Sequence, residues 1–276
     1  MAFIAVTQLA SAQWLFFWKG DYRVALNAGV NMSFYKVKFV GPLADKVIDD
    51  VNLAISPTVG IHSGMEKDIN KKTAFGFYYD FQAYSTHWSV SFGEDNDNKT
   101  LYKVKSTTLN MMQGIYFAFD IKKMKRKKKL QALGGVGIYE DIRFKGKIAE
   151  EETGSGYTSA LASVLSPSEL ALLATGYAPD NNSFDVPFSF DFGVNILGGV
   201  EYRFNENFFI EGRLVYMLPL IGSGSTMDEW SSNMGSSMSS SSETDTKNTA
   251  KLNPYVAYQN DKINRIAFVG TIGFRF

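Results

Sequence analysis

The last thirteen residues of the chain, 264–276, alternate between two kinds of side chain. Counting back from Phe276, every second residue is apolar or small, whereas residues such as Arg265 and Arg275 stand between them. A period of two is that of a β-strand, whose successive side chains point to opposite faces. The segment is therefore predicted to be a strand with apolar surroundings on one face and polar surroundings on the other. Its large apolar positions are Phe268, Ile272, Phe274 and Phe276.

The same alternation recurs in seven earlier segments, which makes eight predicted strands. These segments are longer than the five or six residues of a usual strand, and their apolar faces are rich in aromatic residues. Strands of about ten residues with one apolar and one polar face are typical of a transmembrane β-barrel, in which the apolar face meets lipid. The seven segments are 23–35, 53–65, 73–86, 107–120, 130–145, 186–204 and 208–220.

A soluble β-sandwich also contains alternating strands and is the main alternative. The length of the predicted strands and the absence of matching helices to cover their aromatic faces favour the membrane barrel. We therefore predict an all-β fold, an eight-stranded antiparallel up-and-down transmembrane barrel. In domain terms, residues 13–276 are expected to form a single barrel domain.

The connections between the predicted strands alternate between short and long, as in barrels with short periplasmic turns and long extracellular loops. Both termini are then expected in the periplasm. The predicted periplasmic turns are 66–72, 121–129 and 205–207, and the predicted extracellular loops are 39–52, 88–106, 146–185 and 221–263.

The terminal strand resembles the ending of bacterial outer-membrane proteins, in which a final Phe after alternating apolar residues is read by the barrel assembly machinery. The chain also resembles the PorT-like or OmpA/OmpX-like small outer-membrane barrels, often called porin family proteins. The likeness is most specific in residues 190–220, where Gly-Val-Glu-Tyr, a short Asn-containing turn and Phe-Phe-Ile-Glu-Gly-Arg look like the penultimate hairpin of that family. The resemblance implies a Gram-negative outer-membrane location, contact with outer-membrane lipid, and roles in adhesion, envelope integrity or type IX secretion.

Composition excludes several other classes of protein. The chain has no Cys, two His and a formal net charge of zero, so we expect no disulfide, no metal site, no cofactor and no nucleic-acid partner. No run of 18 apolar residues exists, so any membrane span must consist of strands. Residues 1–12 resemble the apolar part of a signal peptide, with Ala10-Ser11-Ala12 as a cleavage site.

A barrel of eight strands has an interior that side chains just fill, so the lumen is predicted to be plugged. Charges of both signs on the inward faces must then pair, because an unpaired buried charge costs several kcal/mol. A stabilising ion-pair network is the first interpretation, and a catalytic or ion-conducting role is the alternative. The predicted network contains Arg23, Asp80, Asp191, Glu201, Arg203, Glu211, Arg213 and Arg275, with Asp120, Asp141 and Arg143 also inward.

Three connections carry further features. In the third outer loop, Ser166, Pro167, Glu169 and Gly176 predict one short helix by their capping pattern, and this helix either covers its own barrel or binds a partner. The fourth loop is rich in Ser and fits either an adhesive segment or a tolerated insertion. A predicted periplasmic turn carries seven basic residues that fit anionic headgroups of the inner leaflet, an acidic periplasmic partner or plain solvation. These are Lys122, Lys123, Lys125, Arg126, Lys127, Lys128 and Lys129.

One enzymatic interpretation rests on His87 and Ser89 at the predicted outer rim. Their spacing resembles that of the PagL-type lipid A deacylases, in which a rim His activates a Ser toward an acyl ester. Glu94 or Asp95 would orient the His, although a loop position for this acid departs from the family's pattern. The prediction from sequence is nonetheless a non-enzymatic envelope protein that acts through its loops and turns, or as an accessory of a secretion or assembly machine. The lipid hydrolase is the alternative.

Overall fold

The computed structural model describes most of the chain from residue 20 onward. The predicted signal segment 1–12 lies outside the described residues, as does most of the Ser-rich loop. The described ranges are 20–34, 37–40, 44–51, 53–123, 128–144, 146–155, 158–167, 185–186, 189–221, 250–253, 256–260 and 263–276.

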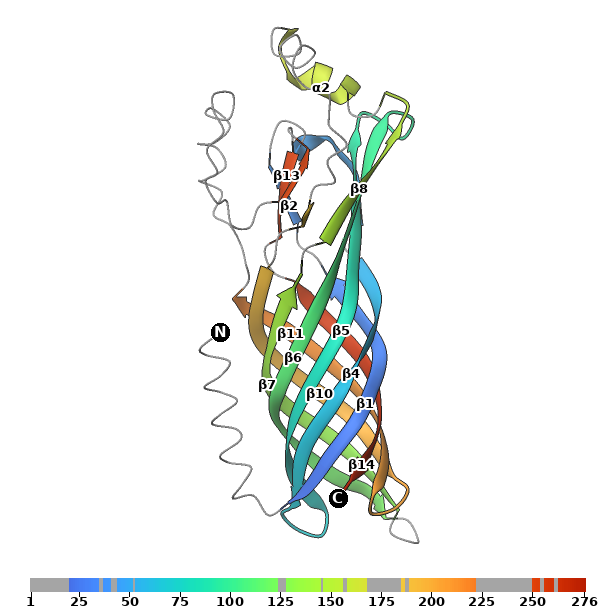
Figure 1. Ribbon diagram of the computed structural model, residues 1–276, viewed down its shortest axis with the longest axis vertical. Helices are drawn as coiled ribbons and strands as arrows, with labels where there is room; N and C mark the ends of the chain where they lie inside the picture. Colours follow the sequence, from blue (N-terminus) through green and yellow to red (C-terminus); the bar gives the residue numbers. More distant parts are fainter. Residues whose placement is uncertain are drawn as a thin grey trace.

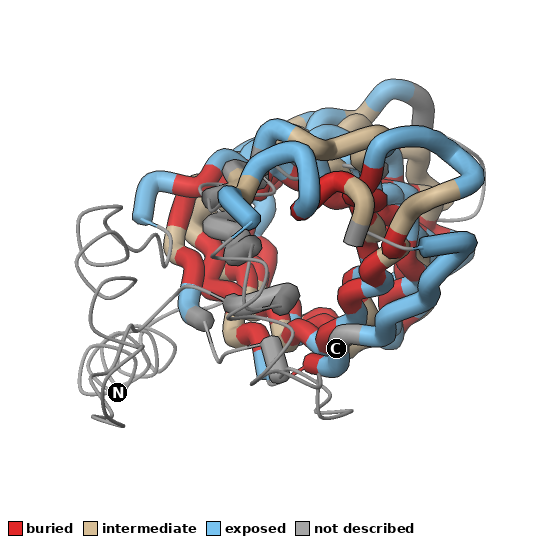
Figure 2. Tube along the Cα trace, turned by 90° about the horizontal axis from the view of Figure 1, so that it is seen from above, coloured by how far each residue is buried: buried red, intermediate tan, exposed pale blue. Residues whose placement is uncertain are grey.

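Eight long strands form a closed antiparallel ring (Figures 1 and 2). Each strand pairs with the strand before and after it, and the last strand pairs with the first, so the ring has no free edge. The eight predicted strands and the predicted barrel are confirmed. The strands are β1 (Asp21–Phe34), β4 (Leu53–Asp68), β5 (Thr73–Gly93), β6 (Lys99–Lys123), β7 (Lys129–Arg143), β10 (Ser189–Arg203), β11 (Phe208–Ile221) and β14 (Asn264–Arg275).

The closing pair, β1 with β14, keeps one register from Arg23 opposite Arg275 to Phe34 opposite Asn264. Backbone hydrogen bonds between Tyr22 and Phe276 in both directions, at 2.9 and 3.0 Å, extend the pairing to the last residue. The rings of Tyr22 and Phe276 stack with centroids 6.3 Å apart. The terminal Phe276 is therefore part of the closure of the ring.

Polar residues face inward and apolar residues face outward. In β14, Arg265 and Thr271 are buried in the lumen, whereas Phe268 and Phe274 are more than half exposed on the outside. In a water-soluble protein, exposed apolar side chains in such numbers would promote aggregation, whereas lipid satisfies them. Viewed along the ring, buried and exposed positions alternate along the strands (Figure 2).

The end of the barrel where β4 meets β5 and β10 meets β11 through short turns is called the turn end below. Both turns use an Asn in the same way. Asn70 Oδ1 accepts hydrogen bonds from the backbone of Lys72 and Thr73, and Asn205 Oδ1 accepts them from Asn207 and Phe208. In such turns the Asn side chain accepts hydrogen bonds from backbone N–H groups that a tight reversal would otherwise leave unpaired.

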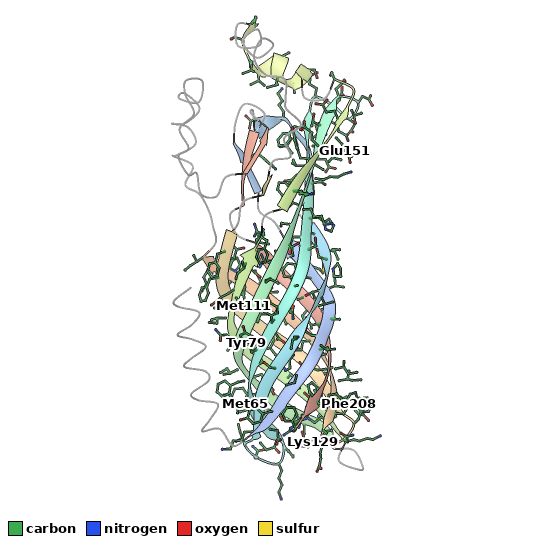
Figure 3. The ribbon with its side chains drawn as sticks, in the orientation of Figure 1. Met65, Tyr79, Met111, Lys129, Glu151 and Phe208 are labelled. Atoms are coloured by element: carbon green, nitrogen blue, oxygen red, sulfur yellow. The ribbon has the colours of Figure 1, made fainter. Side chains whose placement is uncertain are left out.

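Aromatic residues gather on the outside of the barrel near the turn end. Neighbouring rings are in contact from Tyr202 through Phe204 and Phe208 to Phe274, with centroids 4.6 to 5.5 Å apart. Phe208 lies near this end in Figure 3. Belts of this kind occupy the boundary between hydrocarbon and headgroups.

Two of the predicted turns at this end are shorter than expected. β4 continues to Asp68, so Glu66 belongs to the strand instead of the predicted turn 66–72. The pairing of β6 with β7 extends as far as Lys123, which lies opposite Lys129. The turn is therefore shorter than the predicted 121–129. Residues 124–127 of that turn lie outside the described residues.

The predicted outer loop 88–106 is wrong over most of its length. β5 and β6 run far beyond the ring and stay paired up to Gly93 opposite Lys99, so that only residues 94–98 form the turn. The strands persist because each gains a new partner above the ring. β3 (Val47–Val51) pairs with β5, and β8 (Gly146–Thr153) pairs with β6.

We call the part of the molecule beyond the ring the extension (Figure 1). A second sheet with the order β12-β13-β2 belongs to it, and Phe39 of β2 lies 5.2 Å from Phe92 and 6.5 Å from Trp88, measured between ring centroids. Burial raises the pKa of Glu150 in β8, whose carboxylate accepts a hydrogen bond from the Tyr102 hydroxyl at 3.1 Å. The smaller elements are β2 (Val37–Val40), η1 (Ala44–Lys46), α2 (Thr158–Val164), β9 (Asp185–Val186), β12 (Ala250–Asn253) and β13 (Val256–Asn260).

The predicted loops 39–52, 146–185 and 221–263 therefore contain short strands. The third loop does hold a short helix, α2, but α2 precedes the predicted capping residue Ser166. Residues 168–176, where the capping pattern placed the helix, lie outside the described residues. Among the helices that the structure describes, none has the length and apolar composition needed to cross a membrane.

The closing register can be tested with cysteines, because the chain has none of its own. Ala28 and Gly270 lie opposite each other and both face outward. The variant Ala28→Cys/Gly270→Cys should form a disulfide on oxidation, since directly opposed strand residues have the required Cβ separation. Non-reducing gel migration of the unfolded protein measures it. The pair Ala28→Cys/Phe274→Cys, displaced by four residues, should stay reduced, and equal cross-linking of both pairs would contradict the register.

Candidate functional site

Charged side chains fill the lumen of the barrel from the turn end upward. Every one of the eight residues predicted for the network lies on an inward face and takes part in an ion pair. The structure adds further members, so that six acids and six arginines face one another. The acids are Glu66, Asp80, Asp141, Asp191, Glu201 and Glu211, and the arginines are Arg23, Arg143, Arg203, Arg213, Arg265 and Arg275.

Glu66 is the hub at the turn end. Its carboxylate is fully buried and lies 3.2 Å from Arg23 Nη1, 2.5 Å from Arg203 Nη2 and 3.4 Å from Arg275 Nη1. The Tyr116 hydroxyl donates a further hydrogen bond to Glu66 Oε2 at 3.0 Å. Each of these donors stabilises the charged form of the buried carboxylate.

Arg23 connects the hub to the opposite wall. Its guanidinium forms ion pairs with Glu201 and, at 2.9 Å, with Glu211. It also donates to the Tyr116 hydroxyl at 2.6 Å and lies 4.1 Å from the centroid of the Phe209 ring. The planar, five-donor guanidinium suits such a site, since it reaches several acceptors while packing against an aromatic face.

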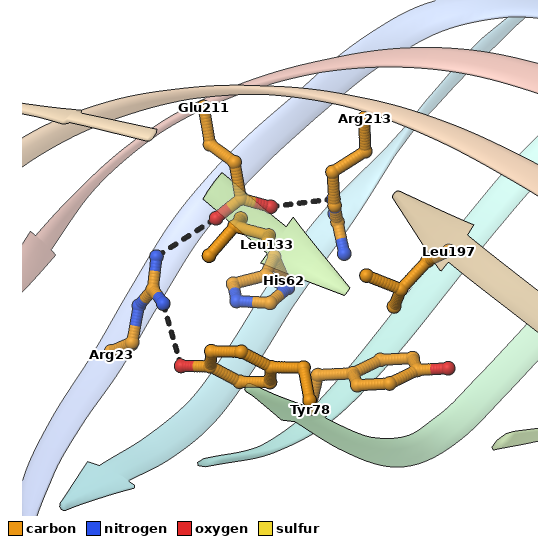
Figure 4. A pocket seen from close by; sticks show the side chains of 8 residues that line it. Arg23, His62, Tyr78, Leu133, Leu197, Glu211 and Arg213 are labelled. Atoms are coloured by element: carbon orange, nitrogen blue, oxygen red, sulfur yellow. Dashed lines mark hydrogen bonds and ion pairs between the residues drawn. The ribbon is translucent and has the colours of Figure 1, made fainter. Parts of the chain in front are cut away.

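A second group lies further from the turn end. Arg213 donates to both oxygens of Asp80, at 2.8 and 3.1 Å, and its Nε lies 2.7 Å from Glu211. Asp80 also contacts His62 Nδ1 at 2.9 Å. Figure 4 shows Glu211 between Arg23 and Arg213, with His62 and Tyr78 beside a small pocket that these residues line.

A third group occupies the lumen toward the extension. Arg265 pairs with Asp141 and, at 3.4 Å, with Asp191, while Arg143 lies 3.0 Å from Asp191. Asn110 donates to Asp141 at 2.8 Å. The network therefore continues from one end of the ring to the other.

Several of the pairs cross the lumen, whereas Arg203–Glu201 and Arg213–Glu211 each stay within one strand. β5 and β11 are four strands apart in the ring, as are β4 and β10, so each member of these pairs is diametrically opposite its partner. Arg213 and Asp80 join the first two strands, and Arg203 and Glu66 join the second two. The buried hydrogen bond from Tyr78 to Asn195 adds a further crossing. Side chains thus close the cross-section at several levels.

Sequence reasoning missed two members of the network, Glu66 and Arg265. Glu66 was assigned to a turn, although it continues the alternation of Gly64 and His62 on the inward face of β4. Arg265 was left out of the predicted network, although its position on the polar face of the terminal strand is a sufficient signal that it points into the lumen. Among the described residues, no group of three or more His, Cys, Asp or Glu side chains is arranged to hold a metal ion.

The residues of the enzymatic alternative lie in the extension. His87 is exposed and Ser89 is partly exposed on the outer face of β5, but β5 continues to Gly93, so they are not at a strand end. No hydrogen bond joins His87, Ser89 or Glu94 to one another in the described part of the chain. Glu94 begins the distal turn of the hairpin, where its backbone N–H donates to Asn98. The arrangement lacks the nucleophile-to-base contact that such a mechanism needs.

The basic turn is described only at its edges. Lys122 and Lys123 end β6, and Lys129 begins β7, with Lys128 just before it. Lys129 lies at the turn end in Figure 3. Lys125, Arg126 and Lys127 fall outside the described residues.

A family model described as "Outer membrane protein beta-barrel domain" matches residues 10–221. The chain belongs to this family. It is an outer-membrane β-barrel protein, and the general family expected from the sequence is confirmed. The model does not distinguish a PorT-like member from other barrels of the family.

Solved structures with a similar fold come from several bacteria. OprG of Pseudomonas aeruginosa is 12% identical with a TM-score of 0.39, over 93% of this chain and 96% of the other. Ail of Yersinia pestis, described as the attachment invasion locus protein in complex with a heparin analogue, is 12% identical with a TM-score of 0.32, over 94% of this chain and all of the other. A search of curated protein sequences gave no match.

Removing the hub should destabilise the barrel. Glu66→Ala leaves Arg23 and Arg203 with one buried counter-charge fewer, which typically costs about 3 to 5 kcal/mol. The temperature at which the folded, faster-migrating gel form disappears should fall clearly. Asp68→Ala, at an exposed acid of the same strand, should leave this temperature unchanged. Equal temperatures for Glu66→Ala and the unmodified protein would rule out a stabilising role for the hub.

Proposed function

We propose that this protein is a non-enzymatic outer-membrane barrel whose lumen is closed by its own ion pairs and whose role is carried by parts outside the ring. The observation that supports it is the set of arginine–carboxylate pairs between strands on opposite sides of the lumen, above all Arg213 with Asp80 and Arg203 with Glu66. An eight-stranded ring leaves no room for a solute beside such pairs.

Passage through the lumen would require the pairs to break. Each broken pair would leave charges in a site with little access to water, and this cost argues against a diffusion pore. The ring then serves as an anchor that holds the hairpin of β5 and β6 at a defined place in the membrane.

The extension is the best candidate for contact with other molecules. Functional segments of rigid scaffolds lie in their connections, and here the described parts of the long connections include short strands that form sheets beyond the ring. We propose roles in envelope structure, in adhesion, or as an accessory of a secretion or assembly machine of the PorT-like kind. The partners would be outer-membrane lipid, the barrel assembly machinery and envelope or secretion-system proteins.

The proposed orientation follows the usual arrangement of bacterial barrels. The turn end would face the periplasm, the extension would face the outside, and both chain termini would be periplasmic. The terminal strand with Phe268, Ile272, Phe274 and Phe276 would be the segment read by the assembly machinery. Among the residues that the structure describes, no contact favours the lipid hydrolase, so it is not proposed.

A conductance measurement tests the closed lumen. In planar bilayers, the purified protein should give no steady ohmic current. Removing one crossing pair without changing the net charge, in Asp80→Ala/Arg213→Ala, should give measurable current, because the variant empties part of the cross-section. The matched control Lys103→Ala/Glu151→Ala removes an exposed ion pair of the extension and should behave like the unmodified protein. A steady porin-like current from the unmodified protein would sink the proposal.

Labelling of single cysteines tests the orientation. Ser155→Cys lies in the extension and Glu206→Cys in a short turn, and both positions are exposed. A membrane-impermeant maleimide should label Ser155→Cys in intact cells, and Glu206→Cys only after the outer membrane is permeabilised. The reverse pattern would show that the barrel is inserted the other way round.

The same two variants can report the neighbours of each end. A thiol-reactive photo-crosslinker at residue 155 or 206, activated in intact envelopes, should capture a reproducible protein neighbour if the protein assists a machine. Capture of lipid alone at both positions would remove the accessory role and leave the structural one.

A further inference from the structure

The outer face of β5 and β6 changes character along its length. Within the ring this face carries exposed Phe77, Phe81, Phe117 and Phe119, and Tyr79 and Met111 lie on it at mid-height (Figure 3). Above the ring, every second residue of β5 and β6 still lies on this same face. The pair Ser85 and Thr107 follows the last apolar pair, Ala83 with Leu109.

The next row on this face brings basic side chains together. His87 lies opposite Lys105, and Lys105 lies opposite Lys147 of β8 on its other side. Lys103 is in the row above, beside Ser89. His87, Lys103, Lys105 and Lys147 are all exposed, and we call them the basic row.

This placement is unfavourable for the protein alone. Like charges directly opposite each other on a sheet repel, and Lys105 and Lys147 are such a pair. Within the described part of the chain neither ammonium group has an ion-pair partner, although Asp185 of β9 lies directly opposite Lys147 on its other side. Lys103 is paired with Glu151 at 2.6 Å.

Apart from Asp185, which is level with Lys147, the acids of β3 and β8 on this face lie higher. Glu151 is level with Leu101, and Asp49 of β3 is level with Ser91, so both stand farther from the ring than the basic row. Three lysines against the one acid Asp185 therefore give these two rows, nearest to the apolar surface, an excess of positive charge.

The height of the basic row matches that of lipid headgroups. Lys105 is four residues beyond Leu109, which corresponds to roughly 10 Å along the membrane normal for a strand tilted by about 40°. The headgroup layer of a bilayer is about 5 to 8 Å thick on each side, and a lysine side chain reaches downward while its stem covers apolar surface. The ammonium groups can thus reach the phosphate level.

We propose that the basic row binds phosphate groups of lipid headgroups in the leaflet nearest the extension. This inference rests on the proposed function only in taking the ring as the anchor in the membrane. Lysines supply point charges and hydrogen-bond donors to phosphate, and the anion removes the repulsion between Lys105 and Lys147. His87 then serves as a polar contact to a headgroup, which gives it a role without hydrolysis.

Titration of the full-length protein in neutral detergent with lipid A, a phosphate-bearing glycolipid, tests the site. Bound lipid is counted by native mass spectrometry, and the apparent Kd is compared between variants. Lys105→Ala/Lys147→Ala should weaken binding roughly 30-fold, since each lysine near an anionic surface contributes about a fivefold factor. The charge-preserving Lys105→Arg/Lys147→Arg should bind normally.

Two controls keep the result specific. Lys71→Ala/Lys72→Ala removes two exposed lysines at the turn end and should not change the Kd. Inorganic phosphate at the lipid concentration should not compete, and effective competition would replace the lipid site with a free-anion site. Equal binding by the alanine variant and the unmodified protein would overturn the proposal. For the same variants, gel migration reports whether the barrel is folded as an anchor, and bilayer current reports whether the lumen is closed. Failure of this inference is therefore distinguishable from failure of the proposed function.

Discussion

The hydrogen-bonded pairing of β1 with β14 is the interaction on which the rest of the structure depends. Hydrocarbon offers no partner to a backbone N–H or C=O group, so a sheet can cross a membrane only if it has no edge. Twelve residue pairs from Arg23–Arg275 to Phe34–Asn264 join the first strand to the last. Because this pairing begins at Tyr22 and Phe276, closure is complete at the turn end, where the aromatic belt lies.

Closure with eight strands also determines what the interior must contain. The narrow lumen brings opposite walls within the reach of single side chains, so charges on one strand are paired by strands four positions away. Small residues make this possible locally. A Cβ atom at Gly76 would overlap the ring of Tyr116, the residue whose hydroxyl lies between Arg23 and Glu66. The glycine on β5 is therefore needed for the close approach of that ring.

The fold was largely predictable from sequence because the ring repeats one rule, apolar outward and polar inward. The rule fails above the ring. In β5 the apolar residues Phe77 and Phe81 face outward, but Trp88, Val90 and Phe92 occupy the opposite parity and are buried. A search for the barrel pattern therefore ends the strand near Thr86 and reads the remainder as a loop. Glu66 was missed for a related reason, since an acid near a strand end resembles a turn residue.

This change of parity has a physical meaning. A strand keeps its apolar residues outward only while lipid surrounds it, and it turns them inward once water surrounds it and a second sheet covers it. The change falls between Tyr84, which faces the lumen, and Trp88, which packs with Phe39. It marks the level at which β5 leaves the hydrocarbon, and the basic row stands just above that level. Since β5 and β6 remain paired without interruption from Thr73 opposite Phe119 to Gly93 opposite Lys99, the same two strands carry Asp80 in the closed lumen and the sheets of the extension. The ion pairs that close the lumen therefore also hold the base of the hairpin that presents the extension.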